Sequence, residues 1–209
     1  MIAFRNWSVN SRSLERQLAK KAADAAYDIV KEQNEELSDL VARFRKFVPA
    51  SLSAMLDSKG FDVSRGVSME RHYTVLSTDI RSFTSFTESI PCQECFKFLN
   101  SFFTVMEPGI RGNGGFVYQY VGDSIMALFP LVGGKFTDNA VQASLHLLKD
   151  VIPNYNAGRA RAGYDPIRIG IGLNTGTVAT GIAGTQERMD ACAFGSTVNL
   201  AARCEGMTK

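Results

Sequence analysis

The stretch that decides the fold reads FVYQYVGDSIMALF and runs from Phe116 to Phe129. Apolar residues alternate on both sides of a Gly122–Asp123 dipeptide, which is the pattern of two antiparallel strands joined by a tight turn. The stretch therefore predicts a β-hairpin that holds Asp123 at its tip.

Strand-like and helical segments alternate on both sides of this hairpin. A Ser85-x-x-Glu88 spacing forms a capping box and predicts that a helix opens there. We expect strands at Tyr73–Ile80, 167–173 and 178–184, the last two joined by a turn at 174–176, and helices from 85 to Pro108, from 138 to 156 with a break or kink at Pro153, and from Ser196 onward. This alternation predicts a mixed fold of strands and helices, α/β or α+β.

The N-terminal part differs in amino-acid composition from the rest of the chain, because all 18 glycines lie between Gly60 and Gly206. Residues 11–47 contain neither Gly nor Pro and are rich in helix formers, so they predict one long helix. Apolar residues occupy heptad positions a and d along it, with one polar intruder: Val30, Leu37, Phe44, Leu40 and Phe47, interrupted by Gln33. We expect a parallel coiled coil with a second copy of the chain, the alternative being a helix folded back on its own domain. The division is a helix at 1–48, a linker at 49–71 and a folded domain at 72–209.

Composition excludes several classes of protein. With 45% hydrophobic residues and a net charge of +2, the chain can build a core but has no charge bias that indicates a nucleic-acid partner. No apolar run is long enough to span a bilayer, and the start lacks a signal peptide. The four cysteines form no disulfide framework, and the Cys92-x-x-Cys95 pair reads as ordinary helix-face cysteines, which favours a cytoplasmic location.

Two acidic residues stand where apolar strands end or turn. Asp79 closes the first predicted strand and Asp123 sits at the hairpin tip. Taken singly, each is explained as a cap or turn residue. Together, carboxylates on neighbouring strands beside a turn into a helix are what divalent cations and a polyphosphate require. No P-loop motif occurs in the chain.

A second pair of polar residues lies on the final predicted helix. Asn199 and Arg203 are four residues apart and share one helix face. Such an Arg can stabilise the charge that develops on a transferring phosphoryl group, and such an Asn can orient a sugar oxygen. The alternative is an ordinary solvated helix face.

Four blocks in order carry a resemblance that covers residues 47–209. They are YTVLSTDIRSFTSFTE, GGFVYQYVGDSIMALF, IRIGIGLNTGTVATGIAG and MDACAFGSTVNLAARCEGMTK, and they resemble the signature blocks of class III nucleotidyl cyclases. The resemblance implies an α+β, ferredoxin-like fold of palm type that acts as a homodimer with its sites at the subunit interface. It also implies the conversion of ATP to 3′,5′-cyclic AMP and pyrophosphate. The Phe47–Pro49 stretch after the long helix resembles bacterial members in which a signalling helix feeds the catalytic domain.

The resemblance also assigns roles to residues. It implies that Asp79 and Asp123, with the carbonyl of Ile80, bind two Mg²⁺ or Mn²⁺ ions, and that Phe83 and Thr84 belong to the turn that holds the triphosphate. It implies that Asn199 orients the ribose and that Arg203 stabilises the transition state, both from the second subunit. We further expect an upstream sensor in a longer protein, which would be cytoplasmic or the cytoplasmic part of a membrane-anchored receptor.

This sequence departs from the family pattern at the two positions expected to read the base. At the position of Gln119, adenylate cyclases usually have Lys and guanylate cyclases usually have Glu. At the position of Cys192, adenylate cyclases have Asp or Thr, and guanylate cyclases often have Cys. The Gln119 amide can donate and accept, so it fits either purine. Guanylate cyclase activity, or a weakly active regulatory dimerisation module, therefore stays open beside adenylate cyclase. Family members also continue past the final helix, so we expect a catalytic domain truncated at Lys209.

Overall fold

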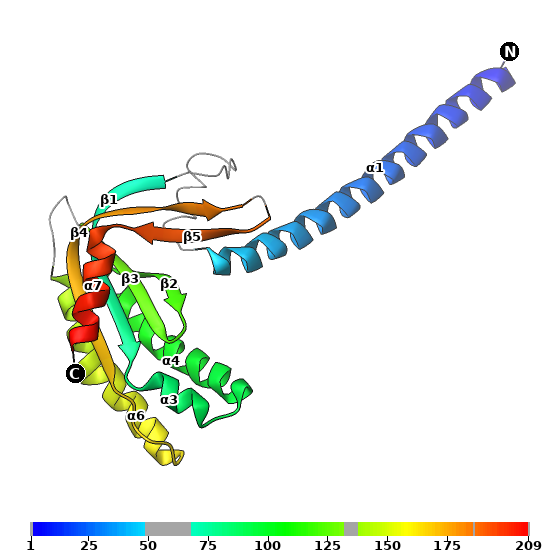
Figure 1. The fold of residues 1–209 in the computed structure, drawn as a ribbon. Helices are drawn as coiled ribbons and strands as arrows, with labels where there is room; N and C mark the ends of the chain where they lie inside the picture. Colours follow the sequence, from blue (N-terminus) through cyan, green and yellow to red (C-terminus); the bar gives the residue numbers. More distant parts are fainter. Residues whose placement is uncertain (1, 49–67, 132–137, 186, 209) are drawn as a thin grey trace. The chain divides into compact units, whose positions relative to one another are not determined.

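A computed structural model describes residues 2–48, 68–131, 138–185 and 187–208, and the side chains from Arg16 onward (Figure 1). The helical and strand elements in chain order are α1 (Ile2–Phe44), η1 (Arg45–Phe47), β1 (Ser68–Ile80), α3 (Phe83–Glu88), α4 (Cys92–Gly112), β2 (Phe116–Val121), β3 (Ser124–Pro130), α5 (Asn139–His146), η2 (Leu147–Val151), α6 (Ile152–Arg161), β4 (Ile169–Gly184), β5 (Met189–Phe194) and α7 (Ser196–Met207).

The chain divides into two compact units, Met1–Phe47 and Val48–Lys209. The first consists of α1 and η1, so the long N-terminal helix expected from the sequence is confirmed. The apolar heptad residues Val30, Leu37, Leu40, Phe44 and Phe47 are each at least half exposed. Most of the expected linker, 49–71, lies outside the described residues. Within the described part of the chain, no helix combines the length and apolar character needed to cross a membrane.

The second unit is built on a five-stranded antiparallel sheet with the order β2-β3-β1-β4-β5. The elements from β1 to β4 follow the βαββαβ sequence of a ferredoxin-like fold, and β5 extends the sheet at one edge. The hairpin predicted around Gly122 is present as β2 and β3. The expected α+β class is therefore confirmed.

The central strand β1 separates two cores because successive side chains point to opposite faces. Leu76 and Ile80 face the larger core, which α3, α4, α5, η2 and α6 cover. Tyr73 and Val75 face the smaller core, which includes Ala201 of α7. Helices thus pack on both faces of the sheet, and α7 is alone on its face among the described helices of this second unit (Figure 1).

One prediction about the strands is wrong. The sequence predicted a turn at 174–176, but β4 runs unbroken from Ile169 to Gly184 and pairs with all of β1. Asn174 turns toward α7, where its side-chain amide donates to the carbonyl of Thr197 at 3.1 Å. At Gly176, an added Cβ would lie 2.6 Å from the hydroxyl of Thr197. Asn174 and Gly176, which have the composition of a turn, therefore serve the packing of α7. Asn174 bonds to that helix, and Gly176 leaves space for it.

The helix boundaries also differ from those predicted. α3 begins at Phe83, two residues before the predicted capping box, after Ser82 in a left-handed conformation with φ 59°. α4 continues through Pro108 to Gly112. The helix expected at 138–156 extends to Arg161, and a π-helical turn, η2, precedes Pro153 in it. That turn accommodates the proline, which cannot donate to the preceding turn.

Candidate active site

Asp79 and Asp123 meet where β1 ends. Because β1 pairs antiparallel with β3, the end of β1 lies beside the tip of the β2–β3 hairpin. The main-chain N–H of Ile80 donates to Asp123 Oδ2 at 3.0 Å, and the hydroxyl of Ser124 donates to Asp79 Oδ2 at 2.5 Å. The two carboxylates expected to act together are therefore neighbours in the structure.

Their proximity has an electrostatic consequence. Burial raises the pKa of Asp123, and the negative charge of Asp79 raises it further, while the N–H of Ile80 lowers it in part. A bound cation would relieve this repulsion between like charges. The donors are oxygen atoms, which suit hard ions such as Mg²⁺ and Mn²⁺. No group of three or more His, Cys, Asp or Glu residues that could hold a metal occurs among the described residues, so a cation here would need main-chain or substrate oxygens as well.

The residue after the Asp79–Ile80 pair connects this site to α7. Arg81 pairs with the Glu205 carboxylate at 2.9 Å, and it also donates to the Glu205 carbonyl at 2.9 Å and the Thr208 hydroxyl at 2.5 Å. Burial raises the pKa of Glu205, Arg81 lowers it, and Asp79 raises it. No local pattern in the sequence indicates this pair, although each member lies within two residues of a predicted site residue.

The turn expected to hold a triphosphate is formed by the start of α3. The Phe83 ring packs against Phe86 and Phe98 with ring centroids 6.2 Å apart in both pairs, so its side chain belongs to the core. Thr84 is exposed. The first N–H groups of a helix have no partner within that helix, which leaves those of the α3 start as candidate donors.

A β-bulge redirects the predicted base-reading residue Gln119. Val117 pairs with Ala127 and Gln119 pairs with Met126, so Tyr118 is an extra residue in β2. Strict alternation would place Gln119 on the same face as Val117, which packs on the larger core. The bulge instead places it on the face of the smaller core, where Met126 lies.

The bulge also brings the second base-reading position close. The Tyr118 hydroxyl donates to the carbonyl of Cys192 at 2.9 Å, although β2 and β5 lie at opposite edges of the sheet. Burial, with the proximity of Cys192 as a smaller cause, raises the pKa of Tyr118 to about 12, so this hydroxyl keeps its proton at neutral pH. The sheet is thus curled enough to bring the segments that contain Gln119 and Cys192 together.

α7 presents Asn199 and Arg203 to the outside. Both are exposed, whereas Thr197, Ala201 and Glu205 are buried on the other side of the helix. The Thr197 hydroxyl donates to the carbonyl of Thr177 at 2.8 Å and anchors the start of α7 on β4. Among the described contacts, none joins Asn199 or Arg203 to Asp79 or Asp123.

Glycines in β4 allow α7 to approach the sheet closely. A Cβ on Gly172 would overlap the main chain of Ala201 and Glu205, and a Cβ on Gly170 would overlap the guanidinium of Arg81. Gly172 therefore allows a close approach of two backbones, and Gly170 leaves room for the Arg81 side chain.

Comparison with known proteins gives consistent matches. Residues 67–209 match the family described as the adenylate and guanylate cyclase catalytic domain. An adenylate cyclase of Anabaena cylindrica is 35% identical over 179 residues, which cover 83% of this chain but only 35% of that protein. The chain thus spans about a third of that relative.

Solved structures agree with the sequence matches. The structure of a bacterial light-regulated adenylyl cyclase has a TM-score of 0.70 and 28% identity over 86% of this chain and 51% of that one. The guanylyl cyclase Cya2 has a TM-score of 0.60 and 31% identity over 68% of this chain and 73% of that one. The expected class III fold is thereby confirmed. By its sequence blocks, its ferredoxin-like sheet and the match over 67–209, this chain belongs to the family of adenylate and guanylate cyclase catalytic domains.

Proposed function

We propose that this chain is the catalytic part of a homodimeric cyclase that converts ATP into 3′,5′-cyclic AMP and pyrophosphate. The observation that carries the proposal is the pair formed by Asp79 and Asp123, held together through the Ile80 N–H and the Ser124 hydroxyl. Family membership supports the cyclase reaction. Because the chain spans only part of its relatives, the activity of the whole protein is part of the proposal.

The acidic pair and the carbonyl of Ile80 would hold two Mg²⁺ or Mn²⁺ ions together with oxygens of the substrate phosphates. When bound, such ions lower the pKa of the ribose 3′-hydroxyl and offset the charge of the leaving pyrophosphate. The raised pKa of Asp123 supports this assignment, because burial and the nearby charge of Asp79 both disfavour the ionised carboxylate, and a bound cation would offset both effects.

The remaining residues would position the substrate. Main-chain N–H groups at Phe83 and Thr84 would hold the triphosphate, while Asn199 of the second copy would orient the ribose. The 3′-oxygen forms a bond to the α-phosphorus and gives up its proton to water. The bond from that phosphorus to the oxygen that bridges it to the β-phosphorus breaks, and this oxygen leaves with pyrophosphate. Arg203 of the second copy would stabilise the charge that develops in this step. The exposure of both α7 residues supports their supply in trans.

Gln119 and Cys192 would contact the purine. Two adenylate cyclases among the relatives above support ATP, whereas the match to the guanylyl cyclase Cya2 supports GTP as the alternative substrate. The protonated Tyr118 hydroxyl is committed to the Cys192 carbonyl, so it would hold this part of the base site in place without reading the base itself.

The long helix α1 would pair with its copy in a parallel coiled coil and set the orientation of the two catalytic units, under the control of an upstream sensor. The exposed heptad residues support this role. Deletion of residues 1–46 is expected to weaken dimerisation in sedimentation experiments. An unchanged dimer dissociation constant would contradict the coiled coil.

The reaction is tested with the full-length protein, Mn²⁺ or Mg²⁺, and ATP or GTP, by chromatography of the cyclic product. We expect cyclic AMP as the main product and its loss on chelation of the metal. If cyclic GMP is the main product, the substrate is GTP and not ATP. Product at background level from both nucleotides would contradict catalysis and favour a regulatory dimerisation module.

A further inference from the structure

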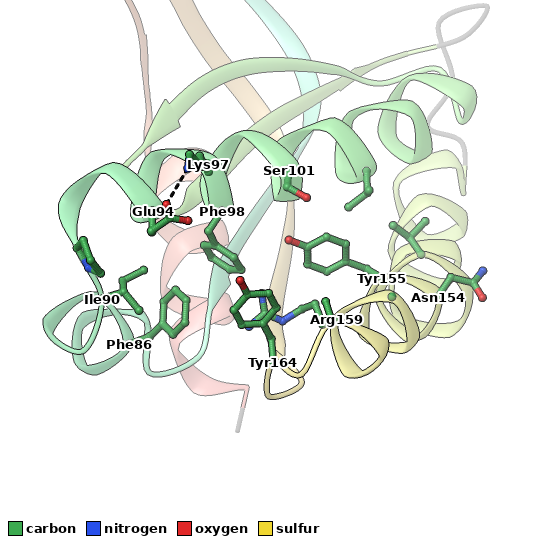
Figure 2. A pocket seen from close by; sticks show the side chains of 15 residues that line it. Phe86, Ile90, Glu94, Lys97, Phe98, Ser101, Asn154, Tyr155, Arg159 and Tyr164 are labelled. Carbon is green, nitrogen blue, oxygen red and sulfur yellow. Dashed lines mark hydrogen bonds and ion pairs between the residues drawn. The ribbon is translucent and has the colours of Figure 1, made fainter.

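A large cavity lies on the side of the sheet that does not carry α7. It has a volume of about 1000 Å³ and lies among α3, α4, η2, α6 and the segment that follows α6 (Figure 2). Aromatic and aliphatic side chains form much of its lining, including Phe86, Ile90, Phe98, Val105, Tyr155 and Tyr164. None of the residues assigned above to the metal, the triphosphate, the ribose or the base lines it, so it is separate from the candidate active site.

One charged side chain is buried within this lining. Arg159 is only 9% exposed, and Figure 2 shows its guanidinium among the rings. The guanidinium carbon lies 4.9 Å from the centre of the Phe98 ring and 5.5 Å from that of Tyr164, with Phe86 and Tyr155 slightly farther away. The rings attract the cation, but they do not neutralise it.

The hydrogen-bonding capacity of Arg159 is mostly unused. Its Nε donates to the carbonyl of Asp165 at 2.8 Å. A guanidinium has five N–H donors, and within the described part of the chain the other four have no hydrogen-bond partner and no carboxylate pairs with them. A buried charge without an opposite charge is costly. The remaining donors of Arg159 are therefore available to an anionic group that enters the cavity.

The other charges of the lining do not supply that group. Glu94 pairs with Lys97 at 2.7 Å, so these two side chains offset each other. One positive charge, that of Arg159, is left in a largely apolar cavity. A monoanion would balance it, whereas the multiple charges of a polyphosphate would not.

We propose that this cavity binds a small organic carboxylate with an aromatic or aliphatic body. The planar guanidinium matches a carboxylate with two parallel hydrogen bonds. The body of the ligand would pack on the rings of Phe98 and Tyr164, and the volume is that of a site for a drug-sized molecule. The ligand would differ from the nucleotide in charge and in location, so this site does not depend on the proposed cyclase reaction.

The test uses 2-naphthoate as the probe and 2-naphthamide as its uncharged counterpart, measured by titration calorimetry on the full-length protein without nucleotide. We expect the carboxylate to bind at least about tenfold more tightly than the amide, as a charge-assisted bidentate contact implies. Arg159→Met should weaken naphthoate binding by about the same factor. Arg161→Met is the matched control, because Arg161 is exposed on the same helix and does not line the cavity. It should leave the affinity unchanged.

A second variant guards against the loss of folding in Arg159→Met. Gly158 lines the cavity, and a Cβ added there meets no atom within 4 Å. Gly158→Leu should therefore place a side chain in the cavity beside Arg159, keep the helix intact and weaken binding while Arg159 stays in place. Equal affinity for the acid and the amide, no binding of naphthoate, or unchanged binding to Gly158→Leu would each overturn the proposal. If naphthoate does not bind, the alternative occupant of the cavity is an acidic side chain of a partner protein.

Discussion

The two faces of the central sheet are built differently. On the face covered by α3–α6, β1 contributes buried apolar side chains such as Leu76 and Ile80 to the larger core. On the face covered by α7, the same strand ends in Asp79, glycines of β4 replace large side chains, and α7 presents Asn199 and Arg203 to the outside. The first face carries the larger core of the fold, while the second carries residues that we propose form a site shared with a second copy.

The largest expected effect separates these two faces on a single strand. Asp79→Asn should reduce cyclase activity by about 10²-fold or more, since it removes one of the two charges that would hold the metal ions. Leu76→Ala, three residues earlier, should lower the free energy of unfolding by about 2–5 kcal/mol. Urea unfolding and product assays on both variants check this. Comparable loss of stability in both would contradict the distinction between the faces.

Asp138→Asn serves as the control for the charge change, since Asp138 is exposed and makes no side-chain capping bond at α5. It should leave both stability and activity unchanged.

The next effect concerns the close approach of α7. Gly172→Ala should lower the free energy of unfolding by about 1–3 kcal/mol, because the added methyl group overlaps the main chain of Ala201 and Glu205. The same change at Gly112, where an added Cβ meets nothing within 4 Å, should have little effect. Thermal unfolding of both variants measures the difference. Equal stability would mean that α7 does not pack as tightly as described.

A smaller effect tests the polar part of the α7 face. Gln119→Lys should raise the ratio of kcat/KM for ATP over GTP by about tenfold, because a cation donates to adenine but repels the N–H edge of guanine. Gln142→Lys adds the same charge at an exposed position of α5 and should leave the ratio unchanged. An unaltered ratio in Gln119→Lys would show that this side chain does not contact the base.

The smallest effect is a pH dependence of stability. The folded-state pKa of Asp123 is raised above its ordinary value of 3.8, so the folded protein binds the proton more tightly than the unfolded chain does. The associated stability is fully present below pH 3.8 and is lost as the pH rises through the raised pKa. In the absence of metal, urea unfolding should show wild type losing stability relative to Asp123→Asn over this range. Parallel curves for the two proteins would contradict the raised pKa that burial and the charge of Asp79 give to Asp123.

The sequence predicted the parts of the fold that local pattern determines. The hairpin around Gly122 and the long glycine-free helix are present, and Asp79 and Asp123, which were expected on neighbouring strands, lie together. The apolar alternation and the helix formers are local signals, so strands and helices can be predicted from them without knowledge of the tertiary packing.

Features that depend on tertiary contacts were not predictable in this way. Asn174 and Gly176 have the composition of a turn, but they lie inside β4 because α7 packs on them. The bulge at Tyr118 carries no signal in the hydrophobic pattern, yet it decides which face Gln119 occupies. The Arg81–Glu205 pair joins residues 124 positions apart, so only the fold reveals it.

The central claim is that two copies share each site, and mixing two inactive variants tests it most directly. Asp79→Asn and Arg203→Ala should each be inactive alone, because each lacks one half of the site. If the halves come from different copies, a mixture should recover about a quarter of wild-type activity, since half of the dimers are mixed and each has one intact site. Activity that stays at the level of the separate variants, although sedimentation or cross-linking shows mixed dimers, would contradict the shared site.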